Sequence, residues 1–111
     1  DVYNYGKMKR DFTFIDDIID GIISAIDNNY NCEIFNLGNN TSEELMDVIK
    51  AIEFNLGIKA IINFEAIQKG DVNITYADIK YSNEKLLYKP KVNINDGVAS
   101  FVHWYKNWNE D

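Results

Sequence analysis

The sequence predicts an α/β domain with several helices and a small mixed sheet. Two segments carry clear helical periodicity, and short segments rich in β-branched and aromatic residues lie before and after them. Because strand-like and helical segments alternate along the chain, an α/β arrangement is favoured over a helical bundle. The 111 residues, of which 46% are hydrophobic, are enough for one domain or a piece of one.

Residues 2–27 predict a strand, a turn and a long helix. Residues 2–5 are strand-like and turn at residues 4–6, and residues 11–14 alternate before a helix begins. Asp16 and Asp17 suit the first turn of that helix, because the macrodipole favours negative charge there. The isoleucines of the helix form a single apolar stripe, made of Ile15, Ile18, Ile19, Ile22, Ile23 and Ile26.

The middle of the chain predicts a strand followed by a helix. Residues 33–37 form the strand candidate. Thr41 and Glu44 have the spacing of a capping box, which predicts a helix start, and Gly57 predicts its end in a left-handed cap. The residues expected on the buried face of this helix are Leu45, Val48, Ile49, Ile52 and Leu56.

The last part of the chain predicts one more strand and two helices. Residues 60–64 are the strand candidate, and residues 68–75 form a polar loop. A short helix is expected over residues 82–87, before Pro90, and a longer one over residues 95–108. The apolar face of the longer helix comprises Val98, Phe101, Val102 and Tyr105. The isoleucine stripe and residues 34–37 are suited to packing on a larger body than this chain provides.

The charge and cysteine content exclude several classes of protein. A net charge of −7 argues against binding to nucleic acid or anionic membranes, which needs a positive footprint. No apolar run reaches the length that crosses a bilayer. The single cysteine, Cys32, excludes an internal disulfide and a cysteine-rich metal site, and it fits a reducing cytoplasm. Positive charge gathers only in residues 6–10, Gly-Lys-Met-Lys-Arg.

The residues show no catalytic apparatus, metal site or cofactor loop. His103, the single histidine, lies in an aromatic stretch without a partner for nucleophilic catalysis. The pairs Asp16-Asp17 and Glu43-Glu44 are explained by helix starts. No G-x-G-x-x-G follows a strand, and no tyrosine–lysine pair with four-residue spacing lies in a plausible active-site context. Three aromatic residues are expected in a core or an interface, namely Trp104, Tyr105 and Trp108.

The block over residues 6–18, Gly-Lys-Met-Lys-Arg-Asp-Phe-Thr-Phe-Ile-Asp-Asp-Ile, opens a series of blocks that covers nearly the whole chain. Any one block is a weak signal, whereas the ordered series is specific. The series closely resembles UDP-glucuronate 4-epimerases, which are extended short-chain dehydrogenase/reductase enzymes. The later blocks are residues 34–40, 44–47, 70–72, 75–78, 88–90, 101–102 and 104–105.

The resemblance implies that residues 1–111 are the C-terminal nucleotide-sugar-binding domain of a protein about three times longer. The N-terminal Rossmann domain, which binds NAD and carries the catalytic tyrosine and lysine, would then be absent. The partner expected for this chain is a UDP-sugar. NAD is expected in the full-length parent and not on this chain, which is expected to be inactive alone.

The resemblance also implies which residues bind the nucleotide. Arg10 matches the ligand of the pyrophosphate, and a guanidinium in the only positive cluster suits that role. Phe12 resembles an aromatic residue that lines the same pocket, and Tyr3 one that meets the uracil. In the polar loop over residues 68–75, Gln68 would donate to phosphate without bringing charge, and Asp71 would accept from the ribose hydroxyls.

Two departures from the family pattern stand out. Asn73 lies where the family usually has proline, and a glycine expected between Leu87 and Tyr88 is missing. They leave open whether the chain is a drifting or degenerate copy of the family. Two other interpretations also stay open. One is the substrate domain of a related nucleotide-sugar dehydratase or decarboxylase. The other is a truncated relic or oligomerisation module that forms a homodimer, or otherwise associates, through its exposed apolar faces.

Overall fold

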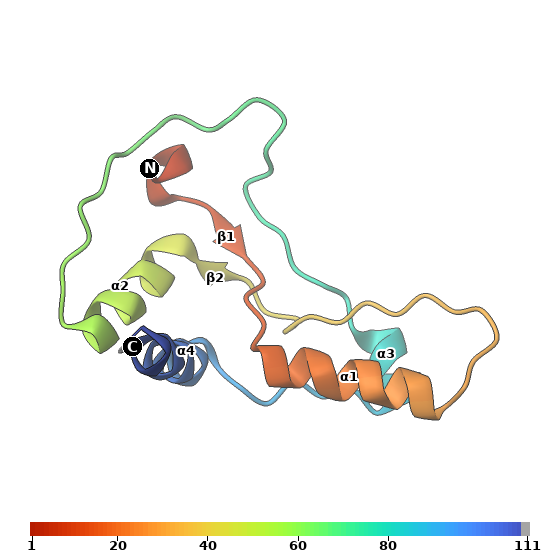
Figure 1. Ribbon diagram of the computed structural model, residues 1–111. Coiled ribbons are helices and arrows are strands. Elements are labelled where there is room, and N and C mark those ends of the chain that lie inside the picture. The colour runs from red at the N-terminus through yellow and green to blue at the C-terminus, as the bar shows by residue number, and fades with distance from the viewer. Residues whose placement is uncertain (110–111) are drawn as a thin grey trace.

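The computed structural model describes residues 1–109 as an open, elongated body (Figure 1). Its extents are 47 × 40 × 20 Å, and its radius of gyration is 16.5 Å, whereas a compact domain of this length has about 13 Å. Its accessible surface is 8179 Å², against about 6,300 Å² for a compact monomer of this mass. The described part of the chain therefore does not close on itself around one core.

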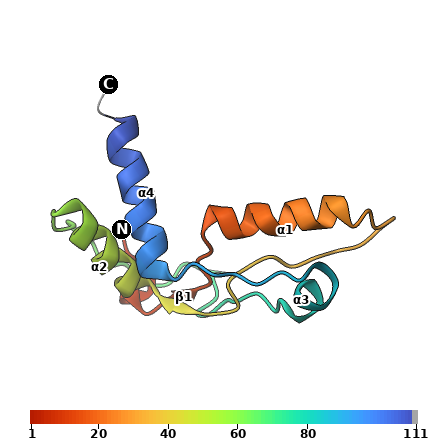
Figure 2. The ribbon, with the colours of Figure 1, turned by 90° about the horizontal axis from the view of Figure 1, so that it is seen from below.

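Within residues 1–109, four α-helices and a minimal sheet make up the fold. Figure 1 shows α2, α4 and the N-terminus in one arm, and α1 and α3 in the other. Figure 2 shows α4 projecting away from α1. The predicted α/β class, with several helices and a small sheet, is confirmed. The elements in order are η1 (Tyr3–Gly6), β1 (Lys9–Arg10), α1 (Ile15–Asp27), β2 (Glu43–Glu44), α2 (Leu45–Leu56), α3 (Lys80–Leu86) and α4 (Ile94–Trp108).

The strand β1 lies at the centre of the small sheet. On one side it pairs antiparallel with β2, where Lys9 faces Glu44. On the other side Lys9 forms a parallel bridge with Ile74. The positive segment, residues 6–10, therefore has residues 43–44 on one side of its strand and residues 73–75 on the other.

The three strands predicted from composition are wrong within the described residues. Residues 3–6 form a 3₁₀ turn in which Asn4 and Tyr5 have φ of 51° and 50°. Val2 and Phe64 make only a single parallel bridge. Residues 33–37 are extended without a ladder, and Ile34 is 86% exposed. A strand needs a neighbouring strand for its backbone groups, and residues 1–109 supply none to residues 33–37. The carbonyl of Asn36 accepts instead from the hydroxyl of Ser82.

The predicted capping box is also wrong. Glu44 is the N-cap of α2, but its side chain makes no capping hydrogen bond. The amide of Leu45 instead donates to the carbonyl of Met8, at 2.9 Å. The pair Glu43-Glu44 therefore lies in a strand, and not in the first turn of a helix. The predicted end of α2 is confirmed, because Gly57 has φ of 74° and donates to the carbonyl of Glu53.

The end of α3 explains how the chain manages without the glycine expected there. Leu87, the residue after the helix, has φ of 55° and so occupies the left-handed region that glycine favours. Its side chain is exposed. The amide of Tyr88 donates to the carbonyl of Ser82, at 3.3 Å. The turn is thus kept, at the cost of strain in a leucine backbone.

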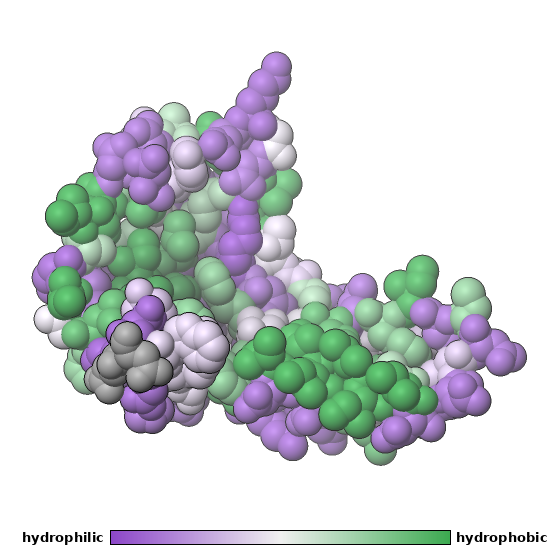
Figure 3. Space-filling model, viewed as in Figure 1, coloured by the Kyte–Doolittle hydropathy of each residue, from purple (hydrophilic) through white to green (hydrophobic). Residues whose placement is uncertain are grey.

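Helix α1 turns its apolar stripe outward. Ile15, Ile19, Ile22, Ile23 and Ile26 are between 44% and 69% exposed, and Figure 3 shows them as a continuous hydrophobic patch along the helix. Nothing within residues 1–109 covers this patch, which agrees with the expectation that the stripe packs on a larger body.

The inward face of α1 is small and polar, and it fastens the helix to the rest of the chain. The buried carboxylate of Asp17 accepts from the amides of Lys91 and Val92. Gly21 is packed so tightly that an added Cβ would lie 2.7 Å from the Leu37 side chain. Ser24 donates to the carbonyl of Leu86, at 2.8 Å. These contacts leave the isoleucine stripe free for another body.

The other arm has a small core where α2 packs on α4. Val48, Ala51 and Val102 are buried. The prediction that Ile52 is buried is wrong, since it is partly exposed. The aromatic residues of α4, Phe101, Trp104, Tyr105 and Trp108, are likewise exposed and belong to no core among the described residues. No helix within residues 1–109 is long and apolar enough to span a bilayer.

The Tyr88 hydroxyl gives a pH-dependent contribution to stability. It is buried and donates to the carbonyl of Gly38 at 2.8 Å, and burial, followed by the charges of Asp17 and Asp11, raises its pKa. Because the pKa is raised in the folded state, the contribution of Tyr88 to the unfolding free energy is complete below about pH 10, the pKa of an unfolded tyrosine. It is lost as the pH rises through the pKa of the folded state. Tyr88→Phe is expected to cost about 1 kcal/mol at pH 7 and to flatten the alkaline loss. Urea unfolding at pH 7 and above about pH 10 checks this, with Tyr5→Phe, at an exposed tyrosine, as control. If Tyr88→Phe loses unfolding free energy with rising pH as steeply as wild type does, the prediction is wrong.

Candidate functional site

The guanidinium of Arg10, at the end of β1, is held by three acceptors. Its Nη2 pairs with Oδ1 of Asp71 at 2.8 Å. Its Nη1 donates to the carbonyls of Lys9 at 2.8 Å and Asn73 at 3.3 Å. The side chains of Arg10 and Asp71 are 27% and 32% exposed. The positive group is therefore oriented by the protein while still being accessible to a ligand from solvent.

The loop that carries Asp71 is fixed to β1 by the backbone. The amide of Lys9 donates to the carbonyl of Asn73 at 2.8 Å, and the amide of Thr75 donates back to Lys9 at 3.2 Å. The amide of Asp71 donates to the carbonyl of Gln68, which closes a turn with Gly70 at φ +87°. The structure thus brings Arg10 and Asp71 together and places Gln68 in the same turn as Asp71.

Tyr3 lies half-buried in η1, on a segment joined to the same loop. The backbone of Val2 exchanges hydrogen bonds with residues 63 and 65. The side chain of Asn4 donates to Oδ1 of Asn73 at 2.9 Å. Tyr3 and Arg10 therefore both lie on segments that are hydrogen-bonded to the loop around Asn73. Asn73, where the family pattern has proline, supplies acceptors to both ends.

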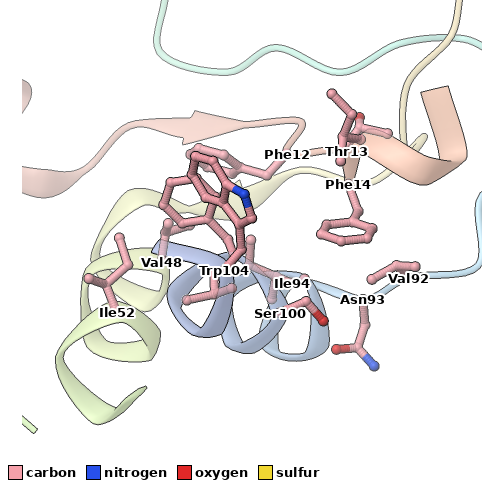
Figure 4. Close-up of a pocket in the computed structure, with 14 residues that line it drawn as sticks. Phe12, Thr13, Phe14, Val48, Ile52, Val92, Asn93, Ile94, Ser100 and Trp104 are labelled. Carbon is pink, nitrogen blue, oxygen red and sulfur yellow. The ribbon is translucent and has the colours of Figure 1, made fainter. Parts of the chain in front are cut away.

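Phe12 is placed elsewhere. It lines an apolar cavity of about 700 Å³ between the start of α1, α2 and α4, together with Phe14, Val48 and Trp104 (Figure 4). Arg10 does not line this cavity. This placement differs from the expectation that Phe12 shares a pocket with Arg10. Because β1 ends at Arg10, the alternation that would put residues 10 and 12 on one face no longer applies.

Sequence reasoning missed two residues at the site. Asp11 accepts from the backbone amides of Asn39, Asn40 and Ala77, and Asn73 gives Arg10 its carbonyl. Both act on or through the main chain, so side-chain patterns gave no signal of them. Among residues 1–109 no cluster of three or more His, Cys, Asp or Glu is placed to hold a metal.

The arrangement suits binding of an anion, with hydroxyl groups beside it. A guanidinium can give paired hydrogen bonds to phosphate oxygens, and a carboxylate next to it can accept from hydroxyls. His103 is exposed on α4 and shares a hydrogen bond with the Asn107 side chain.

The chain has clear relatives, although no protein-family model matches it. An uncharacterised protein of Methanocaldococcus jannaschii is 49% identical over 111 residues, covering 97% of this chain and 34% of that protein. UDP-glucuronate 4-epimerase 4 of Arabidopsis thaliana is 33% identical over 119 residues, covering 95% of this chain and 27% of the enzyme. The chain spans about a third of the length of the relatives it matches.

Solved structures agree with the sequence comparison. The UDP-glucuronic acid 4-epimerase of Bacillus cereus, in complex with UDP-glucuronic acid and NAD, matches with a TM-score of 0.85 at 31% identity. The match covers 96% of this chain and 35% of that enzyme. The resemblance drawn from the sequence blocks is therefore confirmed: over about a third of their length, this chain is related in sequence and in fold to the UDP-glucuronate 4-epimerases.

Proposed function

We propose that residues 1–111 are the C-terminal nucleotide-sugar-binding domain of an NAD-dependent 4-epimerase of the UDP-glucuronate type. In this proposal the chain binds the UDP part of the substrate. The observation that carries it is the oriented, accessible guanidinium of Arg10, paired with Asp71 at 2.8 Å. In a chain with a net charge of −7, this group supplies the local positive charge that a diphosphate needs.

Each site residue has a separate task in this proposal. Arg10 gives paired hydrogen bonds to the pyrophosphate, and Gln68 adds an uncharged donor. Asp71 keeps one oxygen on Arg10, which leaves Oδ2 for a ribose hydroxyl. Tyr3 offers its ring to the uracil. Gly70, where an added Cβ meets no atom within 4 Å, leaves the backbone of that turn open to the ligand.

The contribution of the chain to catalysis is positioning. Binding the nucleotide remotely holds the sugar at the nicotinamide, so binding energy is used to lower the barrier elsewhere. NAD supplies hydride chemistry when it is bound to the longer protein. The proposed NAD-binding part covers the isoleucine face of α1 and pairs with residues 34–37. An exposed, free Cys32 is compatible with the cytoplasm that we propose as its location.

Calorimetry with separate ligands tests this function. The chain is expected to bind UDP more tightly than uridine, to bind no NAD, and to turn over no UDP-glucuronate when NAD is added. Phosphate contacts to Arg10 account for the preference for UDP. Turnover by this chain alone, NAD binding, or equal affinity for uridine and UDP would overturn the proposal.

The isoleucine face of α1 also favours a second candidate, a non-catalytic association module. Five isoleucines at least 44% exposed form one patch, and contiguous apolar patches on soluble domains mark interaction sites. Sedimentation over a range of concentrations separates the candidates. Homodimers without UDP binding would favour the module over the epimerase domain.

A further inference from the structure

We propose that Asp11 is the positioning residue that keeps Arg10 aligned with its partners, an inference that rests on the proposed binding of UDP. The carboxylate of Asp11 is saturated with donors. Its Oδ1 accepts from the amide of Asn39 at 2.8 Å and from the hydroxyl of Thr13 at 3.2 Å. Its Oδ2 accepts from the amides of Asn40 and Ala77, each at 3.0 Å. One side chain thus joins three segments that are distant in sequence.

The cage around Asp11 is tight. An added Cβ on Gly38 would lie 2.9 Å from Oδ2 of Asp11 and 2.5 Å from the Cβ of Ala77. Such close approach is possible only because residue 38 is a glycine. Charge-assisted hydrogen bonds to backbone amides are among the stronger ones in proteins. The position of Asp11 therefore fixes residues 38–40 and 77 relative to the end of β1.

Arg10 lies between two residues that are hydrogen-bonded to residues 71–77, the segment that contains its acceptors Asp71 and Asn73. Before it, the backbone of Lys9 bonds to Asn73 and Thr75. After it, Asp11 bonds to the amide of Ala77. Asp71 and Asn73, which accept from the guanidinium, belong to this same segment. Without the bond to Ala77, residues 71–77 keep their bonds to Asn4, Lys9 and Ser42. They lose the bond from the residue that follows Arg10, and we expect the 2.8 Å pair between Arg10 and Asp71 to be less well aligned.

The chain offers a matched control in Asp17. Its carboxylate accepts from the amides of Lys91 at 3.1 Å and Val92 at 3.0 Å. It is therefore a second carboxylate anchor for backbone amides, but it ties α1 to residues 91–92, which carry none of the proposed ligands. A general loss of stability affects both anchors, whereas a positioning effect on Arg10 belongs to Asp11 alone.

The experiment compares Asp11→Asn with Asp17→Asn. In each variant an amide nitrogen replaces an oxygen and faces a backbone N–H, so both are expected to lower the melting temperature. Asp11→Asn is expected to weaken UDP binding about ten-fold and uridine binding less than about two-fold, with UDP affinity near wild type in Asp17→Asn. The amide NMR signals of Arg10, Asp71 and Asn73 are expected to move only in Asp11→Asn. Should Asp11→Asn fail to fold, Thr13→Val removes one of its donors and is expected to act in the same direction by about two-fold.

Three outcomes would overturn the inference. These are equal losses of UDP affinity in the two aspartate variants, equal losses for uridine and UDP in Asp11→Asn, and unmoved signals of Arg10 and Asp71. Failure of the proposed function looks different. If wild type binds no UDP but Asp11→Asn alone moves the signals of Arg10 and Asp71, the function is wrong and the positioning role of Asp11 stands.

Discussion

Arg10→Ala is expected to weaken UDP binding by about a hundred-fold, the largest effect of any single substitution in this chain. The guanidinium provides the oriented positive charge of the site, and hydrogen bonds to charged groups are worth about 1.5–3 kcal/mol each. Arg10→Lys is expected to recover only part of the affinity, because an ammonium cannot give paired, planar hydrogen bonds to phosphate. Calorimetry with UDP measures both variants, and uridine affinity is expected to change little.

Lys7→Ala is the control for charge alone. Lys7 belongs to the same positive segment and is exposed, so removing it lowers the local charge by the same amount. It is expected to change UDP affinity by less than about two-fold at physiological salt, because exposed charges are screened. Equal losses in Lys7→Ala and Arg10→Ala would show that UDP is attracted by charge density and not bound by Arg10.

The second large effect is expected on the isoleucine face of α1. The pair Ile19→Lys and Ile22→Lys is expected to change the unfolding free energy of this chain by less than about 0.5 kcal/mol, because both side chains are already partly exposed. In the longer enzyme that we propose, the same pair places two charges against an apolar surface. It is expected to cost several kcal/mol and to abolish activity. Denaturant unfolding of the chain and of the longer enzyme measures the contrast.

Gly21→Ala is the matched control on the opposite face of α1. An added Cβ would lie 2.7 Å from Leu37 and 3.0 Å from Tyr88, so this small change is expected to cost the chain alone about 2 kcal/mol. If the two lysines destabilise the isolated chain as much as this alanine does, the isoleucine face is not free in this chain.

Local signals predicted the helices well. The isoleucine spacing predicted α1, and Gly57 predicted the end of α2. Both signals are reliable because periodicity and caps act within one segment. The sequence also indicated that this stripe packs on a body outside the chain, but it did not reveal which residues hold the opposite face of α1. Which face of a helix is covered depends on its neighbours, and here the residues that anchor it are Asp17, Gly21 and Ser24.

Features that need a distant partner were predicted poorly. The capping box at Thr41 fails because the carbonyl of Met8 already accepts from the amide at the helix start. At the site, the family resemblance gave Arg10 and Asp71, which the structure pairs. It did not give the role of Asp11, since most of its donors are backbone amides, those of residues 39, 40 and 77, and no side-chain pattern marks them.

The measurement that tests the central claim most directly is a two-dimensional amide NMR titration of this chain with UDP. If this chain binds UDP through Arg10, we expect a dispersed spectrum in which the signals of Arg10, Gln68 and Asp71 move with added UDP, while those of α1 beyond Ile19 stay in place. A dispersed spectrum in which none of the three signals moves would contradict it, and would leave the isoleucine face of α1 as the feature that defines this chain.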